Sequence, residues 1–304
     1  MTARAPSRIV DAHTHAFPPD WVADRSAHLG SDLWFSQLYE APTARMIDAT
    51  GLIEAMDAAG VAQAVMCGWP WADPGHCREH NDYLAEAAAA SEGRLAWLGT
   101  VSPAPLGAAD EAERCLALGA SGIGELNADA QGFDVAEPTV LADLAAVLVA
   151  AGKPLLLHAS EPVGHRYPGK GTATPDRLVS LLEAHPDLTI ILAHWGGGLP
   201  FYELMPEIAE LTRNVVYDTA ASSYLYRPGI FRAVVEIAGA DRVLWGSDHP
   251  VLNMGRFLRR TRRDAALSDD ELQAILGENA RRVFGLTDLN LEPGIARERM
   301  GISP

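Results

Sequence analysis

The chain has 304 residues, of which 48% are hydrophobic, and its formal net charge is −16. This composition is sufficient for a large buried core, and the acidic balance disfavours nucleic acid or an anionic membrane surface as a partner. Because the sequence has neither an uninterrupted apolar run of about 18 residues nor an apolar signal segment near Met1, we expect no membrane span and a cytoplasmic location.

Short apolar segments alternate with helical segments along the chain. The expected strands lie at residues 8–13, 61–67, 94–101, 121–126, 154–158, 188–194, 214–219 and 242–247. The expected helices lie at residues 50–59, 79–91, 107–118, 137–151, 174–185, 201–212, 229–238 and 268–283. Such alternation is typical of a parallel sheet covered by helices.

The fold class expected from this alternation is α/β, with the strands closed into a (β/α)8 TIM barrel. An open doubly wound sheet would carry a glycine-rich phosphate loop after its first strand, where this chain has His13, Thr14 and His15. We expect one domain over residues 1–304, with a core over about 8–285 and a C-terminal extension over 286–304.

Long, aromatic-rich segments follow several of the expected strands. They are residues 17–48 after the first strand, 68–76 after the second, 161–171 after the fifth and 222–228 after the seventh. All of them emerge at the C-terminal ends of the strands, where barrel enzymes place their active sites. We therefore expect a pocket at this end of the barrel.

Two histidines end the first expected strand. Strand side chains alternate between faces with a period of two, so His13 and His15 point to the same side and can hold one ion. A His-x-His pair alone is a weak indication of a metal. It gains weight because polar residues also end four other strands.

Those further strand-end residues are Glu125, His158, His194 and Asp248. In a closed barrel they would meet His13 near the barrel axis. Burying so many polar groups without partners is costly, and a divalent metal removes that cost by drawing imidazoles and a carboxylate into coordination. Nitrogen and oxygen ligands favour Zn²⁺, and Mn²⁺, Fe²⁺ and Co²⁺ are compatible with them.

At these residues the chain resembles the amidohydrolase superfamily. It is most similar to the amidohydrolase-related branch that contains the aminocarboxymuconate-semialdehyde decarboxylase-like enzymes. The resemblance extends over nearly the whole chain. The matching segments are VDAHTH at 10–15, GIGEL at 122–126, LHA at 157–159, AHWGGG at 193–198, LWGSDHP at 244–250 and ENARRVF at 278–284.

The resemblance implies roles for the strand-end residues. His13, His15, His158 and Asp248 would hold one divalent metal. His194 would lie beside the open coordination position, either as an acid/base or to polarise the substrate. Asp248 would also exchange a proton with the water that the metal activates.

Glu125 stands near the place where binuclear members of the superfamily carry a carboxylated lysine. It could bridge a second metal, bind the first, or hydrogen-bond a ligand histidine. We favour a single metal, with Glu125 as an auxiliary ligand or as a partner of a ligand.

Substrate contacts are expected from the loops beside the site. His165, Tyr167 and Lys170 lie in the glycine- and proline-rich loop after His158, and Arg227 follows the seventh strand. Any of them could hold a substrate carboxylate, and arginine suits this role because it can donate two parallel hydrogen bonds to a carboxylate. The alternative is that they are ordinary surface or loop-packing residues.

Three functions are compatible with this set of residues. We expect metal-dependent hydrolysis of a small organic substrate by metal-activated water. The alternative is metal-dependent, non-oxidative decarboxylation of an unsaturated or aromatic carboxylic acid, because both reactions need a Lewis acid and a nearby proton carrier. A third is a non-catalytic barrel that stores metal or binds a ligand. The partner is a small molecule in the first two cases, and the resemblance allows a homodimer.

Overall fold

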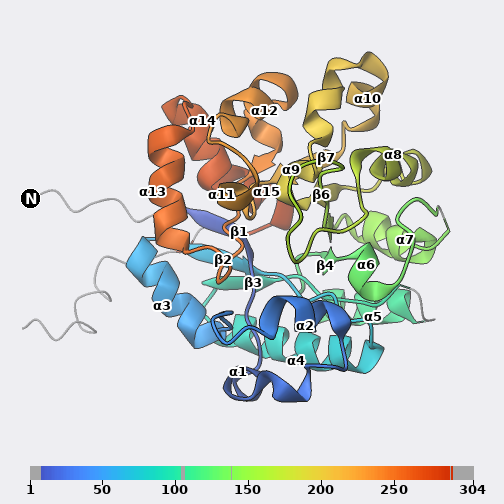
Figure 1. Cartoon of the computed structure of the whole chain (residues 1–304), viewed down its shortest axis with the longest axis vertical. Helices are drawn as coiled ribbons and strands as arrows, with labels where there is room; N and C mark the ends of the chain where they lie inside the picture. Colours follow the sequence, from blue (N-terminus) through green and yellow to red (C-terminus); the bar gives the residue numbers. More distant parts are fainter. Residues whose placement is uncertain (1–7, 104–106, 138, 288, 290–304) are drawn as a thin grey trace, which may run out of the picture.

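The computed structural model describes residues 8–103, 107–137, 139–287 and 289 of the chain (Figure 1). The expected C-terminal extension, residues 286–304, therefore lies outside the described residues apart from positions 286, 287 and 289. In the part of the chain that is described, every helix is too short or too polar to cross a membrane.

Short parallel strands stand at the centre of the fold (Figure 1). They are β1 (Val10–Thr14), β2 (Gln63–Met66), β3 (Leu95–Trp97), β4 (Ile123–Leu126), β5 (Leu155–Leu157), β6 (Ile190–Leu192), β7 (Val215–Asp218) and β8 (Val243–Leu244). Each overlaps one of the strands expected from the sequence. Regular parallel ladders join β1 to β3 and β4 to β8 in consecutive order.

Isolated parallel bridges connect the two ladders into a ring. Gly99, just beyond β3, pairs with Ile123 of β4. On the other side Thr14 of β1 pairs with His249, and the amide of Ala12 donates to the carbonyl oxygen of Trp245 at 2.9 Å. These links close the strands on themselves, and the expected (β/α)8 barrel is confirmed.

Helices surround the strands on the outside. The principal ones are α3 (Ala49–Ala59), α4 (Pro74–Ala90), α5 (Ala108–Ala117), α7 (Ala142–Ala151), α8 (Pro175–Ala184), α10 (Pro206–Leu211), α12 (Ile230–Ala238), α13 (Met254–Asp264), α14 (Asp269–Gln273) and α15 (Asn279–Phe284). Local chemistry sets several of their ends. Asp48 and Asp73 cap the first turns of α3 and α4, and Gly60 ends α3 in the left-handed conformation at φ 72°.

Two expected helices differ from the observed ones for local reasons. The expected helix at 201–212 is divided into the 3₁₀ segment η2 (Leu199–Leu204) and α10, because Pro206 forces Met205 into an extended conformation. The expected helix at 268–283 is a continuous run of α14, the π-helical η4 (Ala274–Glu278) and α15. The helix α13, rich in arginine, was not among the expected elements.

The barrel interior is apolar at one end only. Its inner cluster contains Val10, Ala12, Val65, Leu98, Leu156, Ile191, Val216 and Leu244, and Phe284 of α15 packs against it. A larger, separate cluster lies between the strands and the outer helices. Because apolar side chains fill the interior, the polar strand-end residues gather at the opposite, C-terminal mouth.

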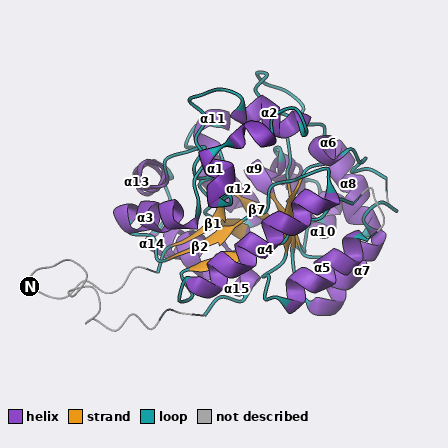
Figure 2. Ribbon diagram, turned by 90° about the horizontal axis from the view of Figure 1, so that it is seen from below, coloured by secondary structure: helices purple, strands orange, loops and turns teal. Residues whose placement is uncertain are grey.

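A third cluster holds a cover over that mouth. Its aromatic members are Phe17, Trp21, Phe35, Tyr39, Trp69 and Trp71. The segment expected as a long loop after β1 instead forms α1 (Pro19–Ala23), the 3₁₀ turn η1 (Arg25–Ala27) and α2 (Leu33–Tyr39). In Figure 2, α2 lies above the strands beside α11 (Ser222–Leu225).

His80 of α4 is fully buried beneath this aromatic cover. Its Nδ1 accepts from the indole N–H of Trp71 at 3.2 Å, and its Nε2–H donates to the carbonyl oxygen of Ala16 at 2.8 Å. Burial lowers the pKa of His80 from 6.5 to about 4. The neutral imidazole is therefore part of the folded state.

Acid is expected to weaken this folded state. Between pH 6.5 and about 4 the unfolded chain binds a proton at His80 that the folded chain does not. The free energy of unfolding should therefore decrease as the pH is lowered through this range, by up to about 1.4 kcal/mol per pH unit. Urea unfolding from pH 7.5 to 4.5 should show a shallower pH dependence in His80→Gln than in the wild type. Equal slopes in the two proteins would contradict this assignment.

Candidate metal centre and active site

The irregular end of β1 brings His13 and His15 together. The pairing of β1 with β2 shifts register between Asp11 and Thr14, so both imidazoles reach the mouth although Ala12 packs in the apolar interior. Their Nε2 atoms lie 3.3 Å apart. Gly246 makes room for His13, because a Cβ at position 246 would lie 2.6 Å from the Cβ of His13.

Four potential ligand atoms meet at this point. The Nε2 of His13 lies 3.3 Å from the Oε2 of Glu125 and 3.9 Å from the Oδ1 of Asp248. The Nε2 of His15 lies 3.7 Å and 3.4 Å from the same two oxygens. All four residues are buried. Lone-pair atoms crowd in this way where a proton or a metal cation lies between them.

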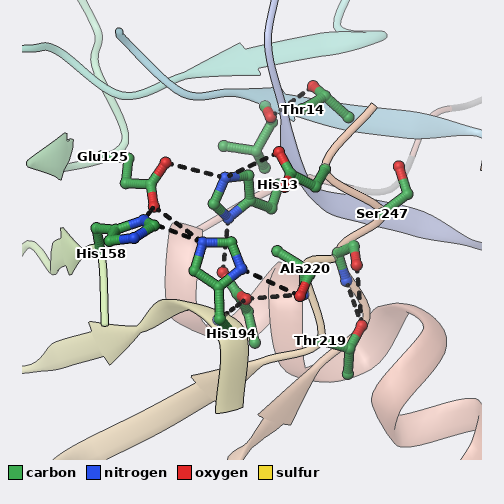
Figure 3. Close-up of polar contacts among 12 residues, drawn as sticks. His13, Thr14, Glu125, His158, His194, Thr219, Ala220 and Ser247 are labelled. Atoms are coloured by element: carbon green, nitrogen blue, oxygen red, sulfur yellow. Dashed lines mark hydrogen bonds and ion pairs between the residues drawn. The ribbon is translucent and has the colours of Figure 1, made fainter. Parts of the chain in front are cut away.

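Glu125 connects this group to a second one. Its Oε1 lies 2.9 Å from the Nδ1 of His158 and 3.4 Å from the Nε2 of His194. The two imidazole nitrogens are themselves 3.1 Å apart. Figure 3 shows the Glu125 carboxylate between the rings of His13, His158 and His194. The structure thus brings together all six strand-end residues that the sequence predicts.

The outer nitrogens of these rings have partners that fix the tautomer. His158 donates from Nε2 to the carbonyl oxygen of Gly169 at 3.0 Å, and His194 donates from Nδ1 to that of Ala220 at 3.1 Å. A neutral imidazole carries one N–H, so the inward nitrogen of each ring has a free lone pair. The same holds for His13, whose outer partner is a carboxylate. Such a donor set suits a divalent metal.

That carboxylate belongs to Asp218, which our sequence reasoning did not select. Its Oδ2 accepts from the Nδ1–H of His13 at 2.7 Å, and its Oδ1 accepts from the amides of His194 at 3.0 Å and Ala220 at 2.9 Å. The hydrogen bond from the backbone amide of His194 to Asp218 supports the left-handed conformation of His194, at φ 57°. The available signal was position, because Asp218 ends the seventh strand as the selected residues end theirs.

The site concentrates negative charge away from water. Burial alone would raise the pKa of Glu125, but Coulombic attraction and hydrogen bonding from His13, with bonds from His158 and His194, hold it well below its usual range. Burial alone would lower the pKa of His194, but Glu125 and then Asp248 raise it to about 9. The cluster therefore attracts positive charge, and a divalent cation fits it.

A cavity of about 400 Å³ opens above the cluster. Its floor includes His15, Glu125, His158, His194 and Asp248. Its walls are mainly apolar or aromatic, with Trp34, Leu38, Trp69, Pro70, Leu225 and Val251 among them. The size and lining are those of a site for a small, flat organic molecule.

The four residues expected to contact substrate are divided by the structure. His165 and Tyr167 line the cavity. Lys170 lines a neighbouring cavity, where its Nζ donates to the carbonyl oxygens of Val163 at 2.6 Å and of His165 at 3.3 Å. Arg227 lines another, separate pocket. Neither Lys170 nor Arg227 lines the cavity above the cluster.

Comparisons with known proteins place this geometry in context. The sequence pattern of a protein family described as amidohydrolase matches residues 10–286. A curated relative, 6-methylsalicylic acid decarboxylase of Penicillium expansum, is 36% identical over 113 residues, which are 31% of this chain. The chain spans about a third of the length of that relative, 34%.

Two solved structures share the fold over most of their length. 5-Carboxyvanillate decarboxylase from Sphingomonas paucimobilis matches with a TM-score of 0.76 at 22% identity, covering 92% of this chain and 99% of its own. The second is 5-carboxyvanillate decarboxylase from Novosphingobium aromaticivorans, in complex with manganese and 4-hydroxy-3-methoxy-5-nitrobenzoic acid. It matches with a TM-score of 0.75 at 21% identity, and the match covers 91% of this chain and 96% of that one.

These relatives correct the expectation of hydrolysis. The curated relative and both structures are named as decarboxylases, which agrees with the alternative and not with the main expectation. The expectation failed for a physical reason. Hydrolysis and decarboxylation both need a Lewis acid beside a proton carrier, so the strand-end residues do not distinguish them.

The contacts of Asp218 lead to a prediction about cation binding. Asp218→Asn keeps an oxygen for the two amides but sets an amide N–H₂ against the N–H of His13. We expect divalent-cation affinity to fall about 10- to 100-fold because the ring of His13 loses its fixed tautomer. Calorimetric titration with Mn²⁺ would measure this loss, and circular dichroism would confirm the fold. An unchanged dissociation constant would contradict a positioning role for Asp218.

Proposed function

Because the chain belongs to the amidohydrolase family, we propose that it is a metal-dependent, non-oxidative decarboxylase of an aromatic carboxylic acid. One observation carries the proposal. Inward-facing imidazole lone pairs and two carboxylates form the floor of a cavity walled by aromatic side chains. The named activities of the relatives support the choice of reaction.

The proposed metal ligands are His13, His15, His158 and Asp248, with Glu125 as an auxiliary ligand or as a partner that holds His158. When bound, the divalent ion would act as a Lewis acid toward the negatively charged oxygens of the substrate. Manganese is named in the structure of one neighbour, and zinc remains the expectation from the nitrogen and oxygen donors.

His194 is the proposed proton donor. Its Nε2 faces the cavity floor, and its Nδ1–H donates to the carbonyl oxygen of Ala220, so His194 gives a proton from Nε2 only as the imidazolium, the form that its raised pKa of about 9 favours. As the bond between the ring carbon and the carboxylate breaks, its electron pair stays on that carbon and takes the proton from Nε2. Carbon dioxide leaves, and the carbon gains a hydrogen in its place.

Other residues of the cavity orient the substrate. Asp248 lines the same floor and is proposed as a second proton carrier, besides its role as a ligand. His165 and Tyr167 are proposed to contact the substrate ring at the wall of the cavity. Trp34 and Trp69 offer flat apolar faces against which an aromatic ring can pack.

Metal content tests the proposed ligands. We expect purified protein to bind roughly one equivalent of a divalent metal, since the proposed ligands would share one coordination sphere. His158→Ala and Asp248→Ala should lose it. His165→Ala is the matched control and should keep it, because His165 lies at the cavity wall and not in the cluster. Elemental analysis measures all four proteins, and full metal content in both ligand variants would refute the assignment.

Carbon dioxide release tests the reaction and the role of His194. The variant His194→Asn suits the left-handed backbone at this position, which asparagine tolerates. We expect CO₂ release from hydroxybenzoic acids to fall about 10²- to 10⁴-fold while metal content is retained. A chelator should abolish wild-type activity and leave the circular dichroism spectrum largely unchanged. Undiminished CO₂ release by His194→Asn would exclude it as the proton donor.

A further inference from the structure

The cavity lining combines carboxylates with histidines at its floor. Glu125 and Asp248 place two carboxylates in the floor. Among the described residues that line the cavity there is no lysine and no arginine. The other polar side chains that face it from the walls include the neutral groups of Gln37, Asn127 and Tyr224.

Two of the nearby cations, Lys170 and Arg25, are engaged elsewhere by the backbone. Lys170 Nζ donates to two carbonyl oxygens of its own loop. The guanidinium of Arg25, in η1 between α1 and α2, donates to the carbonyl oxygens of Tyr39 at 3.1 Å and Ala44 at 2.8 Å. These contacts hold the two positive charges away from the space above the cluster, and Arg227 faces a different pocket.

The walls next to the cluster are apolar as well as uncharged. The ring of Trp34 lies 6.4 Å from that of His158, and the ring of Trp69 lies 6.0 Å from that of His15. A substrate ring close to the metal ligands would therefore lie beside these indole rings. Any anionic group that the ring carries on its far side would lose water and gain no cation in exchange, which is costly.

From this lining we propose that the site selects monocarboxylic aromatic acids whose other ring substituents are uncharged, and rejects dicarboxylic acids. The inference rests on the proposed function, and it narrows the substrate class. One carboxylate is satisfied at the cluster. A methyl group gains from burial against the Trp34, Leu38 and Val251 walls, whereas a second carboxylate would lose water there and meet no lysine or arginine in the described lining.

Matched pairs of ligands test the charge selection. The pairs are 2-hydroxybenzoates that carry either a methyl group or a carboxylate at the same ring position, from 3 to 6. Binding to the manganese-loaded protein is measured by calorimetry at pH 8, where an ordinary imidazole is uncharged. In each pair that shows binding, we expect the methyl compound to bind at least about 100-fold tighter than the carboxylate compound.

The outcomes separate this inference from the proposed function. Equal or tighter binding of the carboxylate members, or no binding by any methyl member, would overturn the inference. Release of CO₂ is scored independently on the same compounds. Methyl-selective binding without CO₂ release would refute the decarboxylase and leave the charge selection standing. Rapid CO₂ release from the dicarboxylic members would support the decarboxylase and refute the charge selection.

A charge introduced at the cavity mouth provides the complementary test. Gln37 on α2 lines the cavity and is exposed to solvent. Gln37→Arg should reduce the preference for the methyl member at least about 10-fold, because a guanidinium pairs with a carboxylate. Gln37→Met is the matched control, with similar length and no charge, and should keep the preference. An unchanged preference in Gln37→Arg would overturn the proposed cause.

Discussion

The structure depends on one electrostatic constraint, which is the gathering of buried carboxylates and imidazole lone pairs at a single point. Glu125, Asp218 and Asp248 are all buried at the mouth of the barrel. Positive charge must accompany them, because isolated carboxylates are not stable in a dry interior. Protons can supply it, as the raised pKa of His194 shows, and so can a metal ion. The outer hydrogen bonds of the rings suit the metal, since in neutral imidazoles they leave the inward lone pairs free.

Several local departures from regular structure serve this constraint. The register shift in β1 turns His13 to the mouth, and Gly246 leaves room for its Cβ. His194 and Asp248 both adopt a positive φ, which is costly for residues other than glycine and persists where the surroundings fix it. For His194 the fixing contact is the Asp218 carboxylate. The apolar interior lies beneath the site and the aromatic cover lies above it, and the cavity opens beside the ligand residues.

The sequence was a good guide to what depends on strand periodicity. The barrel follows from eight alternating segments, and the position of each candidate ligand follows from its place at the end of a strand. What depends on contacts between distant residues could not be read in this way. Asp218 looked like part of a strand, the engagement of Lys170 by its own loop needed coordinates, and the cover helices α1 and α2 looked like a loop. The choice of hydrolysis was wrong because the same ligands serve two reactions. The aromatic-rich segments after the strands do line the cavity, but which of their side chains face it could not be read from the sequence.

The central claim is that neutral imidazoles from separate strands converge on one cation, and X-ray absorption spectroscopy of the zinc- or manganese-loaded protein tests it most directly. The account predicts nitrogen and oxygen scatterers at about 2.0–2.2 Å, with the multiple-scattering signature of at least two imidazoles and no sulfur. A spectrum with sulfur ligands, or one without any imidazole signature, would contradict the account.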